Sequence, residues 1–522
     1  MGTASWIRAR RTLPREWDAI VIGAGVGGLV AASLLAKRGR QRVLVLERHY
    51  VAGGLTQTFT RRRFHFEVGV HYVGDVGHAR APLRRLLADA TDDALAWSPL
   101  PRVFDRIRFE DAEVEIAAGA EALREAYLRF APTERVAIDR YLEDLWACAR
   151  EGPGYLLAPP AHRARSPFRR WSDVTTAEHL DALGLSPRLA ALATTHFGNY
   201  GALPDVSSFA AHAMATAHYF SGASFPVGGG AAITDALTDA ITRRGGVVAI
   251  RAPVEAVRRE GARATGVRLE DGTELDAPLV ISAVGARLTY DTLLDDDAPE
   301  VGAMREAVRA IGPSAAHTAL YLGLSESAET LGLSGENRWL STPTPLRDGA
   351  RLEAWIAGAA GPAGLFVSCP SANDPTFAAR HPGRATVVAS VLQPYAPYDG
   401  WSESGHHRRP EDYEATKARL CGDVLAKTRA LLPEIEGAIE HVEMSSPLTT
   451  RAFTGHPSGE TCGLLHSPAR FRSAIGPRTP LEGLFLAGQD AWLCGVGGAA
   501  FGGLACASLA LKRDLFRAVL FG

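Results

Sequence analysis

The feature that most constrains the fold of this chain is a glycine-rich turn that separates an apolar run from a helical pattern. WDAIVIGAG has the pattern of a short buried strand, and GVGGLVAASLLAKRG has that of a helix that ends at Gly39. QRVLVLER then has the pattern of a second buried strand. Together the three segments predict a β-α-β unit of two parallel strands and their crossover helix.

The glycines of this turn have the spacing Gly23-x-Gly25-x-x-Gly28. In a dinucleotide-binding turn the first glycine makes the tight turn and the second lets the backbone approach a pyrophosphate. The third lets the helix pack on the strand, and the helix N-terminus attracts the phosphates. Glu47 closes the second strand, where a carboxylate holds a ribose hydroxyl. The segment therefore predicts a dinucleotide site, and this motif alone fits NAD as well as FAD.

Two further glycine-rich segments favour FAD. Gly53 and Gly54 follow the second strand, where small residues let the backbone run close to the phosphates and ring of a flavin. Near the C-terminus, GLFLAG predicts a strand that ends at Gly488, and GVGGA predicts the start of a helix. A helix N-terminus at the pyrimidine edge of a flavin stabilises the negative charge that builds there on reduction.

With these motifs the chain resembles the phytoene desaturase-like flavoprotein superfamily, which shares its nucleotide fold with the amine oxidases. FPVGGGAAITDAL and LFLAGQD…GVGGA match its pattern, and GGLTQTFTRRRFHFEVGVHYVG is most similar to the branch of the all-trans-retinol saturases and carotenoid isomerases. The resemblance spans nearly the whole chain and is weakest in two inserted regions that set substrate choice. It implies an α/β fold with a Rossmann-type FAD-binding domain and an inserted α+β substrate domain.

The resemblance also implies which residues bind FAD. The diphosphate and the adenosine ribose are assigned to Gly23, Gly25, Gly28 and Glu47, and the phosphates and ring to Arg48, Gly53, Gly54 and Leu55. The adenine clamp is assigned to Val254. The ribityl chain is assigned to Gly488 and Asp490, and the isoalloxazine to Gly497 and Gly498.

Changes of pattern along the chain predict a discontinuous organisation. Residues 15–90, 225–290 and 440–515 are expected to form the FAD-binding domain, and residues 91–224 and 291–439 a substrate-binding or lid domain. Helical patterns dominate from about residue 82 to residue 215. Within them the Pro- and Arg-rich segment 158–171 is expected to be an exposed loop. TVVASVLQ predicts a strand, and residues 411–431 predict a helix.

The segment FHFEVGVHYVGD, residues 64–75, carries the catalytic candidates His71 and Tyr72. We interpret it as a strand, in which neighbouring side chains point to opposite faces, so that only one of the pair is expected to face the substrate. The other interpretation is a satisfied core histidine or a contact with FAD. Glu67 is expected to anchor a hydrogen bond. His196, Asn199 and Tyr200 compete for a site role, although a surface loop is the simpler interpretation for them.

These residues and the resemblance together predict an FAD-dependent oxidoreductase that acts on C=C bonds of a long apolar polyene, a retinoid or a carotenoid, as a saturase does. Hydride delivery to one carbon needs an acid near its neighbour, and His and Tyr are natural acids for this step. The alternatives are a carotenoid isomerase or desaturase, an enzyme of unsaturated fatty acyl chains, and a binding protein without catalysis. An external electron donor or acceptor is expected, because no second nucleotide motif is evident.

The remaining composition narrows partners and location. The six cysteines lack CxxC and zinc spacings, so we expect reduced thiols and no metal site, with Cys494 as a packing residue that has no partner cysteine nearby. A net charge of −2 gives no reason to expect nucleic acid. The N-terminus has no signal-peptide pattern, which predicts a cytoplasmic protein. Peripheral membrane contact through Phe168 and Trp171, or through the C-terminal LALKRDLFRAVLFG, is the open alternative.

Overall fold

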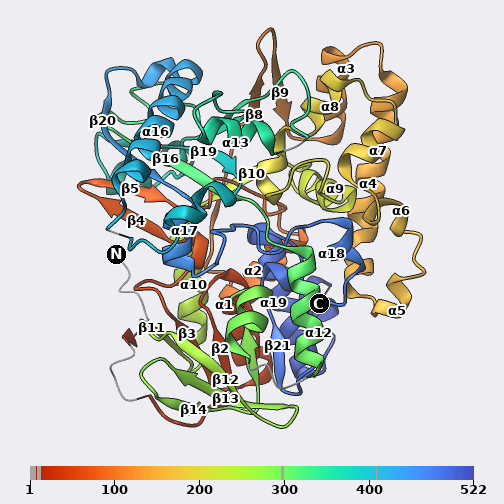
Figure 1. Cartoon of the computed structure of the whole chain (residues 1–522), viewed down its shortest axis with the longest axis vertical. Helices are drawn as coiled ribbons and strands as arrows, with labels where there is room; N and C mark the ends of the chain where they lie inside the picture. The colour runs from red at the N-terminus through yellow and green to blue at the C-terminus, as the bar shows by residue number, and fades with distance from the viewer. Residues whose placement is uncertain (1–6, 9–12, 295–298, 348, 407, 522) are drawn as a thin grey trace.

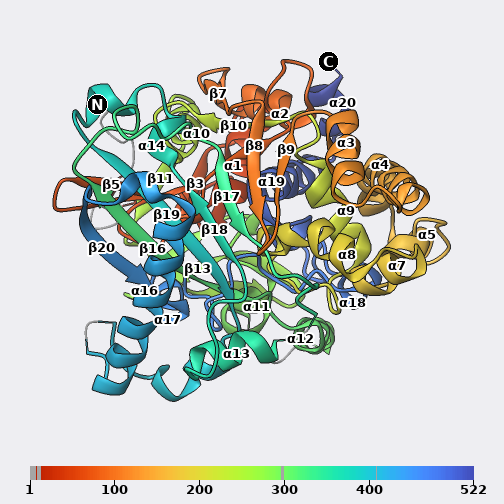
Figure 2. The same ribbon diagram turned by 90° about the horizontal axis from the view of Figure 1, so that it is seen from above.

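The computed structural model describes residues 7–8, 13–294, 299–347, 349–406 and 408–521. Most of the N-terminal segment on which the signal-peptide prediction rests therefore lies outside the described residues. Figure 1 shows one sheet with its helices in the lower half of the molecule and a larger sheet in the upper left. Figure 2 shows a group of helices on the right, beside the edge strand β9 (Glu113–Ala117) of the larger sheet and opposite its other edge strand, β20 (Ile439–Ser445).

The lower sheet has six strands, all paired in parallel. Their order is β1 (Ile7–Arg8), β11 (Val247–Ile250), β3 (Val43–Glu47), β2 (Ala19–Ile22), β15 (Val280–Ser282) and β21 (Leu484–Leu486). The helix α1 (Val26–Gly39) connects β2 to β3, as the sequence predicts. The expected α/β fold with a Rossmann-type unit is confirmed.

Both faces of this sheet are covered, which explains its continuous apolar strands. Val21 and Val45 share an apolar cluster with α1, α10 (Ala231–Thr242) and α19 (Gly495–Leu511). Ile20 and Leu44 lie in a second cluster with an antiparallel meander. The meander consists of β12 (Val254–Glu260), β13 (Arg263–Leu269) and β14 (Glu274–Asp276). Alternate residues of each strand therefore fill two different cores.

Helices α1 and α19 approach each other closely because glycines form their contact. A Cβ on Gly27 would lie 2.9 Å from the carbonyl oxygen of Ala499 in α19 and 2.3 Å from the Cα of Gly488, in the turn after β21. A Cβ on Gly503 of α19 would lie 2.5 Å from the carbonyl oxygen of Gly27. No side chain larger than hydrogen fits at these positions. The glycines of α19 therefore let the N-termini of α1 and α19 lie side by side at the carboxyl ends of the parallel strands.

The upper sheet has seven strands in the order β20 (Ile439–Ser445), β16 (Ala316–Leu324), β19 (Ala385–Gln393), β18 (Leu365–Ser368), β17 (Asn337–Leu340), β8 (Val103–Arg108) and β9 (Glu113–Ala117). Leu320 and Leu322 of β16 pack with Leu420 and Val424 of α16 (Glu411–Leu431). The alternate side chains of β16 face the opposite side of the sheet, away from α16. The predicted strand in TVVASVLQ and the predicted helix at 411–431 are confirmed.

The predicted exposed loop at 158–171 is wrong in part. Helices α5 (Pro160–Arg163) and α6 (Arg169–Ser172) form there, and Phe168 and Trp171 are buried. Phe168 stacks on Tyr155 of α4 (Arg135–Leu157), and the indole of Trp171 donates to Asp144 at 3.1 Å. Their aromatic rings therefore belong to the core and are not available to a membrane.

The other helices and strands connect these layers. The remaining helices with regular α geometry are α2 (Pro82–Thr91), α3 (Ala120–Phe130), α7 (Thr176–Ala182), α8 (Pro187–Ala193), α9 (Phe209–Ala217), α11 (Ala286–Leu288), α12 (Pro299–Ile311), α13 (Ala350–Ile356), α14 (Pro370–Asn373), α15 (Phe377–Arg380), α17 (Pro447–Thr454), α18 (Pro468–Arg472) and α20 (Leu515–Leu520). Short strands are β4 (Thr58–Arg61), β5 (Phe64–Glu67), β6 (Val73–Gly74), β7 (Trp97–Pro99) and β10 (Ala223–Pro226). The predicted domain boundaries stay a prediction.

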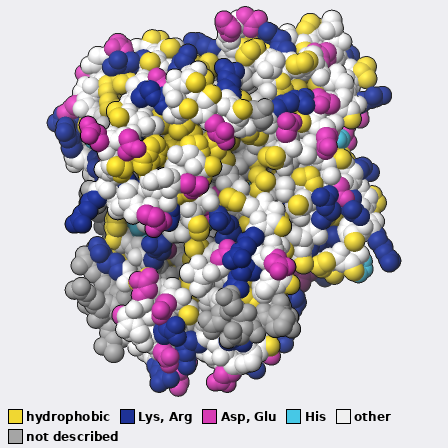
Figure 3. All heavy atoms as spheres, viewed as in Figure 1, with side chains coloured by type: hydrophobic (Ala, Val, Ile, Leu, Met, Phe, Trp, Pro, Cys, Tyr) yellow, Lys and Arg dark blue, Asp and Glu magenta, His cyan; other side chains and the backbone are white. Residues whose placement is uncertain are grey.

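Two further properties concern the exterior. Acidic and basic side chains are mixed over the face shown in Figure 3. Among the described residues, no helix is long and apolar enough to cross a bilayer.

Candidate active site

A large cavity lies between the two sheets, with a volume of about 1010 Å³. This is at the upper end of the roughly 300–1,000 Å³ range for ligand pockets. The turn after β2 and the N-terminus of α19 line one side of it. The inner faces of β16 to β19 line the other side. The cavity is therefore large enough for a cofactor and a substrate to meet inside it.

Glycines form a cradle along the cavity wall. A Cβ on Gly25, Gly488 or Gly495 would meet no atom within 4 Å, so these three backbones face open space. Gly25 forms a bridge with Gly53, and a Cβ on Gly54 would lie only 3.2 Å from the Cα of Gly25. The first turns of α1 and α19 contain no acidic residue, so both positive helix ends remain available to an anion.

Glu47 occupies the opposite end of this cradle, where β3 stops. Its carboxylate accepts hydrogen bonds from the backbone N–H groups of Ala24 and His49, both at 2.8 Å. Burial raises the pKa of Glu47, since removal from water disfavours the charged form. Each oxygen still has a lone pair for a ribose hydroxyl. Val254, at the start of β12, lines the same end of the cavity.

Most of the predicted FAD-binding residues line this cavity. They are Gly23, Gly25, Glu47, Arg48, Gly53, Gly54, Leu55, Val254, Gly488, Gly497 and Gly498. The cradle, the two helix N-termini and the carboxylate together fit a flavin dinucleotide.

Gly28 and Asp490 are not among the lining residues. A Cβ on Gly28 would lie 2.3 Å from the carbonyl oxygen of Gly23, so this glycine permits helix packing. The side chain of Asp490 is buried and accepts from the N–H groups of Ala286, at 2.7 Å, and Leu464, at 2.8 Å. The structure therefore gives the Asp490 carboxylate a role in holding two backbone segments together.

His71 and Tyr72 both line the cavity. That only one of them faces the substrate stays a prediction. The predicted strand ends at Glu67, and residues 68–72 are irregular, so the alternation rule does not apply. His71 shares a hydrogen bond of 2.9 Å between its Nδ1 and the Oγ of Ser368. Burial lowers the pKa of His71 to about 4, so its imidazole is neutral at pH 7.

The hydroxyl of Tyr72 lies in a polar cluster beside aromatic rings of the cavity wall. The side-chain amide of Asn199 donates to the Tyr72 oxygen at 3.0 Å. The rings of Tyr72 and Tyr219 lie 4.5 Å apart. Burial raises the pKa of Tyr72 well above 10, so it keeps its proton at neutral pH.

The interpretation of residues 195–200 as a surface loop is wrong. They form the 3-10 turn η2 (Thr195–Tyr200), in which Tyr200 is buried and Asn199 lines the cavity. His196 is hydrogen-bonded through Nε2 to the fully buried carboxylate of Asp105 at 2.8 Å. The segment therefore forms part of the cavity wall.

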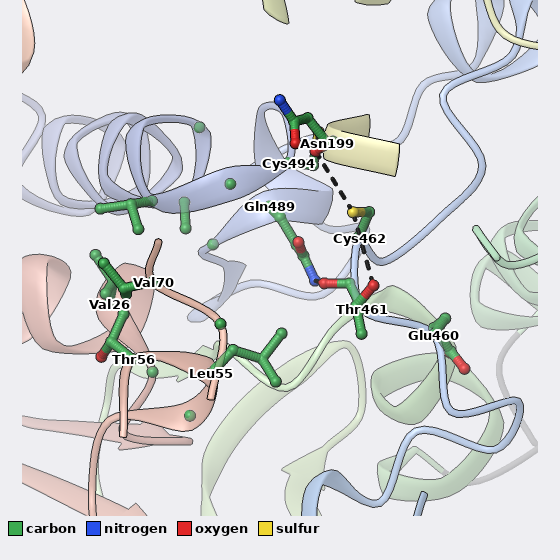
Figure 4. A pocket seen from close by; sticks show the side chains of 18 of the residues that line it. Val26, Leu55, Thr56, Val70, Asn199, Glu460, Thr461, Cys462, Gln489 and Cys494 are labelled. Atoms are coloured by element: carbon green, nitrogen blue, oxygen red, sulfur yellow. Dashed lines mark hydrogen bonds between the residues drawn. The ribbon is translucent and has the colours of Figure 1, made fainter. Parts of the chain in front are cut away.

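Two cysteines meet beside this turn, contrary to the prediction that Cys494 has no partner. Cys494 directly precedes α19, and Cys462 lies in the segment before α18. The thiols of both donate to the carbonyl oxygen of Asn199, each at 3.8 Å. Figure 4 shows Cys462 between Asn199 and Thr461. Both cysteines line the cavity.

The predicted hydrogen-bond anchor Glu67 is confirmed. It is buried outside the cavity lining and accepts from the N–H of Gly230 at 3.0 Å. Burial raises the pKa of Glu67 to about 8.

Sequence reasoning missed His317 and Tyr219 as cavity residues. His317 lies on β16 and is hydrogen-bonded through Nδ1 to the hydroxyl of Thr461 at 2.8 Å. Burial lowers the pKa of His317 to about 4. No motif marks either residue. The alternation of apolar residues along β16 could have indicated that His317 faces away from α16.

Comparisons with known proteins agree with this geometry. The sequence profile of the family described as flavin containing amine oxidoreductase matches residues 26–511. The all-trans-retinol 13,14-reductase of Danio rerio is 31% identical over 538 residues, which cover 96% of this chain and 87% of that protein. The chloroplastic prolycopene isomerase 2 of an Oncidium hybrid cultivar is 25% identical, with coverages of 94% and 83%. Among solved structures, cyclohexylamine oxidase from Brevibacterium oxydans IH-35A has a TM-score of 0.61 at 20% identity, with coverages of 97% and 98%, a likeness of fold alone.

Proposed function

The chain belongs to the family of flavin containing amine oxidoreductases, and we propose that it is an FAD-dependent enzyme that saturates a C=C bond in a long apolar polyene such as a retinoid. The observation that carries the proposal is one continuous cavity. It joins the glycine cradle to a largely apolar wall whose polar groups include Tyr72 and His71. The all-trans-retinol reductase that matches nearly the whole chain points to the same chemistry.

FAD is the proposed form of the flavin because the cavity has two recognition ends. Glu47 and Val254 lie at the end suited to an adenosine, whereas Gly495 and Gly497 lie at the N-terminus of α19, suited to a ring. Gly25 and Gly53 lie at the turn that leads into α1, where a pyrophosphate fits. A mononucleotide would leave the Glu47 end without a partner.

Bound flavin supplies a hydride to one carbon of the double bond. We assign the matching proton to Tyr72, whose raised pKa keeps its hydroxyl protonated at neutral pH. Asn199 donates to the Tyr72 oxygen and so orients the phenol. His71 is neutral and held by Ser368, which suits it to shaping the cavity and excluding water.

The experiment that tests the function is anaerobic incubation of the chemically reduced holoprotein with all-trans-retinol, followed by mass spectrometry of the product. A gain of two hydrogens supports saturation. A product of unchanged mass with altered chromatographic retention would identify an isomerase, as the likeness to prolycopene isomerase makes conceivable. Loss of two hydrogens from a more saturated polyene by the oxidised protein would identify a desaturase. Unsaturated fatty acids serve as the competing substrate class.

The role of Tyr72 has its own test. Tyr72→Phe keeps the ring against Tyr219 and removes the hydroxyl, so turnover is expected to fall by about 100-fold or more while flavin stays bound. His71→Ala is expected to lower turnover less, because a neutral imidazole is a poor acid. Tyr155→Phe removes a buried hydroxyl outside the cavity and serves as the control. Wild-type turnover in both the Tyr72 and His71 variants would refute a proton-transfer role for this pair.

Peripheral membrane contact stays a prediction, and exposed apolar side chains beside the cavity lining support it. Ala149 and Pro153 of α4 line the cavity, as does Phe521. Trp146 and Leu157, on the same side of α4, and Phe521 are exposed. We propose that an apolar substrate enters there from a lipid surface. Flotation with neutral and with anionic liposomes tests this proposal, and failure to bind either kind would contradict it.

A further inference from the structure

The cavity holds a pair of thiols that saturation itself does not use. The thiols of Cys462 and Cys494 share the carbonyl oxygen of Asn199 as their hydrogen-bond acceptor, each at 3.8 Å (Figure 4). The chain has four other cysteines, and none of them lines the cavity. Only this pair therefore combines a cysteine partner with a place beside the N-terminus of α19.

We propose that Cys462 and Cys494 are a redox-active dithiol that carries electrons from an external dithiol to the bound flavin. The inference rests on the proposed function, because each saturated double bond consumes two electrons and the reaction needs a donor. It identifies the chemical class of that donor.

The chemistry balances in two exchanges. An external dithiol reduces the Cys462–Cys494 disulfide through a mixed disulfide; its two S–H bonds break, its own S–S bond forms, and both cysteines regain their protons. The cysteine dithiol then closes to the disulfide again and gives two electrons and two protons to the oxidised flavin site. These electrons finally reach the substrate C=C bond, so the net reaction is dithiol plus alkene to disulfide plus alkane.

The two thiols differ in the way that such an exchange needs. Cys494 is half-buried, whereas Cys462 is only 7% exposed, so an incoming thiolate meets Cys494 first. The interaction between the two neighbouring thiols lowers the pKa of Cys462 and raises the pKa of Cys494. A thiol of lowered pKa leaves faster. Attack on the Sγ of Cys494 therefore releases the better leaving group, Cys462.

Asn199 couples the two parts of the reaction. Its backbone carbonyl accepts from both cysteines, while its side-chain amide donates to the hydroxyl of Tyr72. The thiol pair and the proton donor are therefore held by one residue of η2. An exchange that shifts the two sulfur atoms changes the hydrogen bonds of that residue directly.

The test uses anaerobic holoprotein and dithiothreitol as the external dithiol. Loss of the oxidised-flavin absorption band is followed in the wild type, Cys462→Ser, Cys494→Ser and the control Cys421→Ser, whose side chain lies on α16 outside the cavity. Flavin reduction is expected to slow by more than about tenfold in the two cavity variants and to be unchanged in the control. Full bleaching of every variant by dithionite verifies that flavin is bound and reducible.

Thiol mapping gives a second readout that does not depend on activity. Alkylation and peptide mass spectrometry of the oxidised wild type are expected to find Cys462 linked to Cys494, and dithiothreitol is expected to free both. Wild-type bleaching rates in both serine variants would overturn the inference, as would two free thiols in the oxidised protein. Failure of the proposed function looks different, because wild-type protein reduced by dithionite would then leave all-trans-retinol unchanged.

Discussion

At the scale of single residues, glycines with the same motif spacing do two different physical tasks. Gly25 has open space where a Cβ would be, and its φ of −73° suits any residue. Gly28 is enclosed by the carbonyl oxygen of Gly23 and the side chain of Ala283. The spacing of the motif predicted the turn but could not separate a glycine that faces a ligand from a glycine that faces the protein.

This difference yields a prediction. Gly25→Ala is expected to leave the thermal midpoint of the flavin-free protein unchanged and to weaken FAD binding by about tenfold or more, because the methyl group enters the space for the pyrophosphate. Gly28→Ala is expected to lower the midpoint itself, since its Cβ meets backbone. Thermal unfolding of the apoprotein and flavin titration measure the two effects. Equal loss of stability in both variants would contradict the distinction.

At the scale of elements, the glycine-marked segments were predictable and the rest of the cavity wall was not. β2, α1, β3, β21 and α19 carry periodic apolar patterns and glycine turns, so local sequence determines them. The β8–β9 hairpin lies in a stretch expected to be mainly helical, and its strands are stabilised by pairing with β17, which is far away in sequence. The contact between Cys462 and Cys494 likewise depends on tertiary packing, which no spacing rule reports.

The contact between α1 and α19 is the element-scale feature most open to test. Gly27→Ala would place a methyl group 2.9 Å from the carbonyl oxygen of Ala499 in α19 and 2.3 Å from the Cα of Gly488, and backbone cannot yield as a side chain can. We expect a loss of about 1–3 kcal/mol in the free energy of unfolding, together with lower flavin occupancy.

The matched control is Gly422→Ala in α16, where a Cβ would meet no atom within 4 Å. Alanine favours a helix over glycine by roughly 0.5–1 kcal/mol, so this variant is expected to be as stable as the wild type or slightly more stable. Chemical denaturation monitored by circular dichroism compares the two variants. A harmless Gly27→Ala would show that the two helices tolerate a wider separation.

At the scale of the whole molecule, buried histidines predict sensitivity to acid. Burial lowers the pKa of six histidines from 6.5 to about 4, or to about 3 for His212, and these are His65, His71, His212, His218, His317 and His466. Between pH 6.5 and about pH 4 the unfolded chain binds protons that the folded chain does not, so stability falls as pH falls through this window. Each histidine contributes on the order of 1–3 kcal/mol.

Glu67 acts in the opposite sense, because its folded pKa of about 8 lies above its ordinary value of 4.5. Burial also raises the pKa values of Glu47, Asp75 and Asp235. These four carboxyl groups are fewer than the six histidines, so the thermal midpoint is expected to drop between about pH 6.5 and about pH 4.5. His65→Gln, on β5 outside the cavity, is expected to reduce the proton uptake on unfolding by about one proton in this pH window, so that the drop becomes shallower. A midpoint that stays constant across the window would contradict this prediction.

The arrangement of β21 and α19 against β15 and α1 also has a consequence for the order in which the protein is made. The turn at Gly25 emerges early in synthesis, whereas the strand and helix that complete its cavity emerge after all the segments between them. Until then α1 exposes the glycine surface on which α19 packs, and the wall with Cys494 and Gly495 does not exist. A growing chain therefore has no complete flavin site until α19 has been made and has packed on α1.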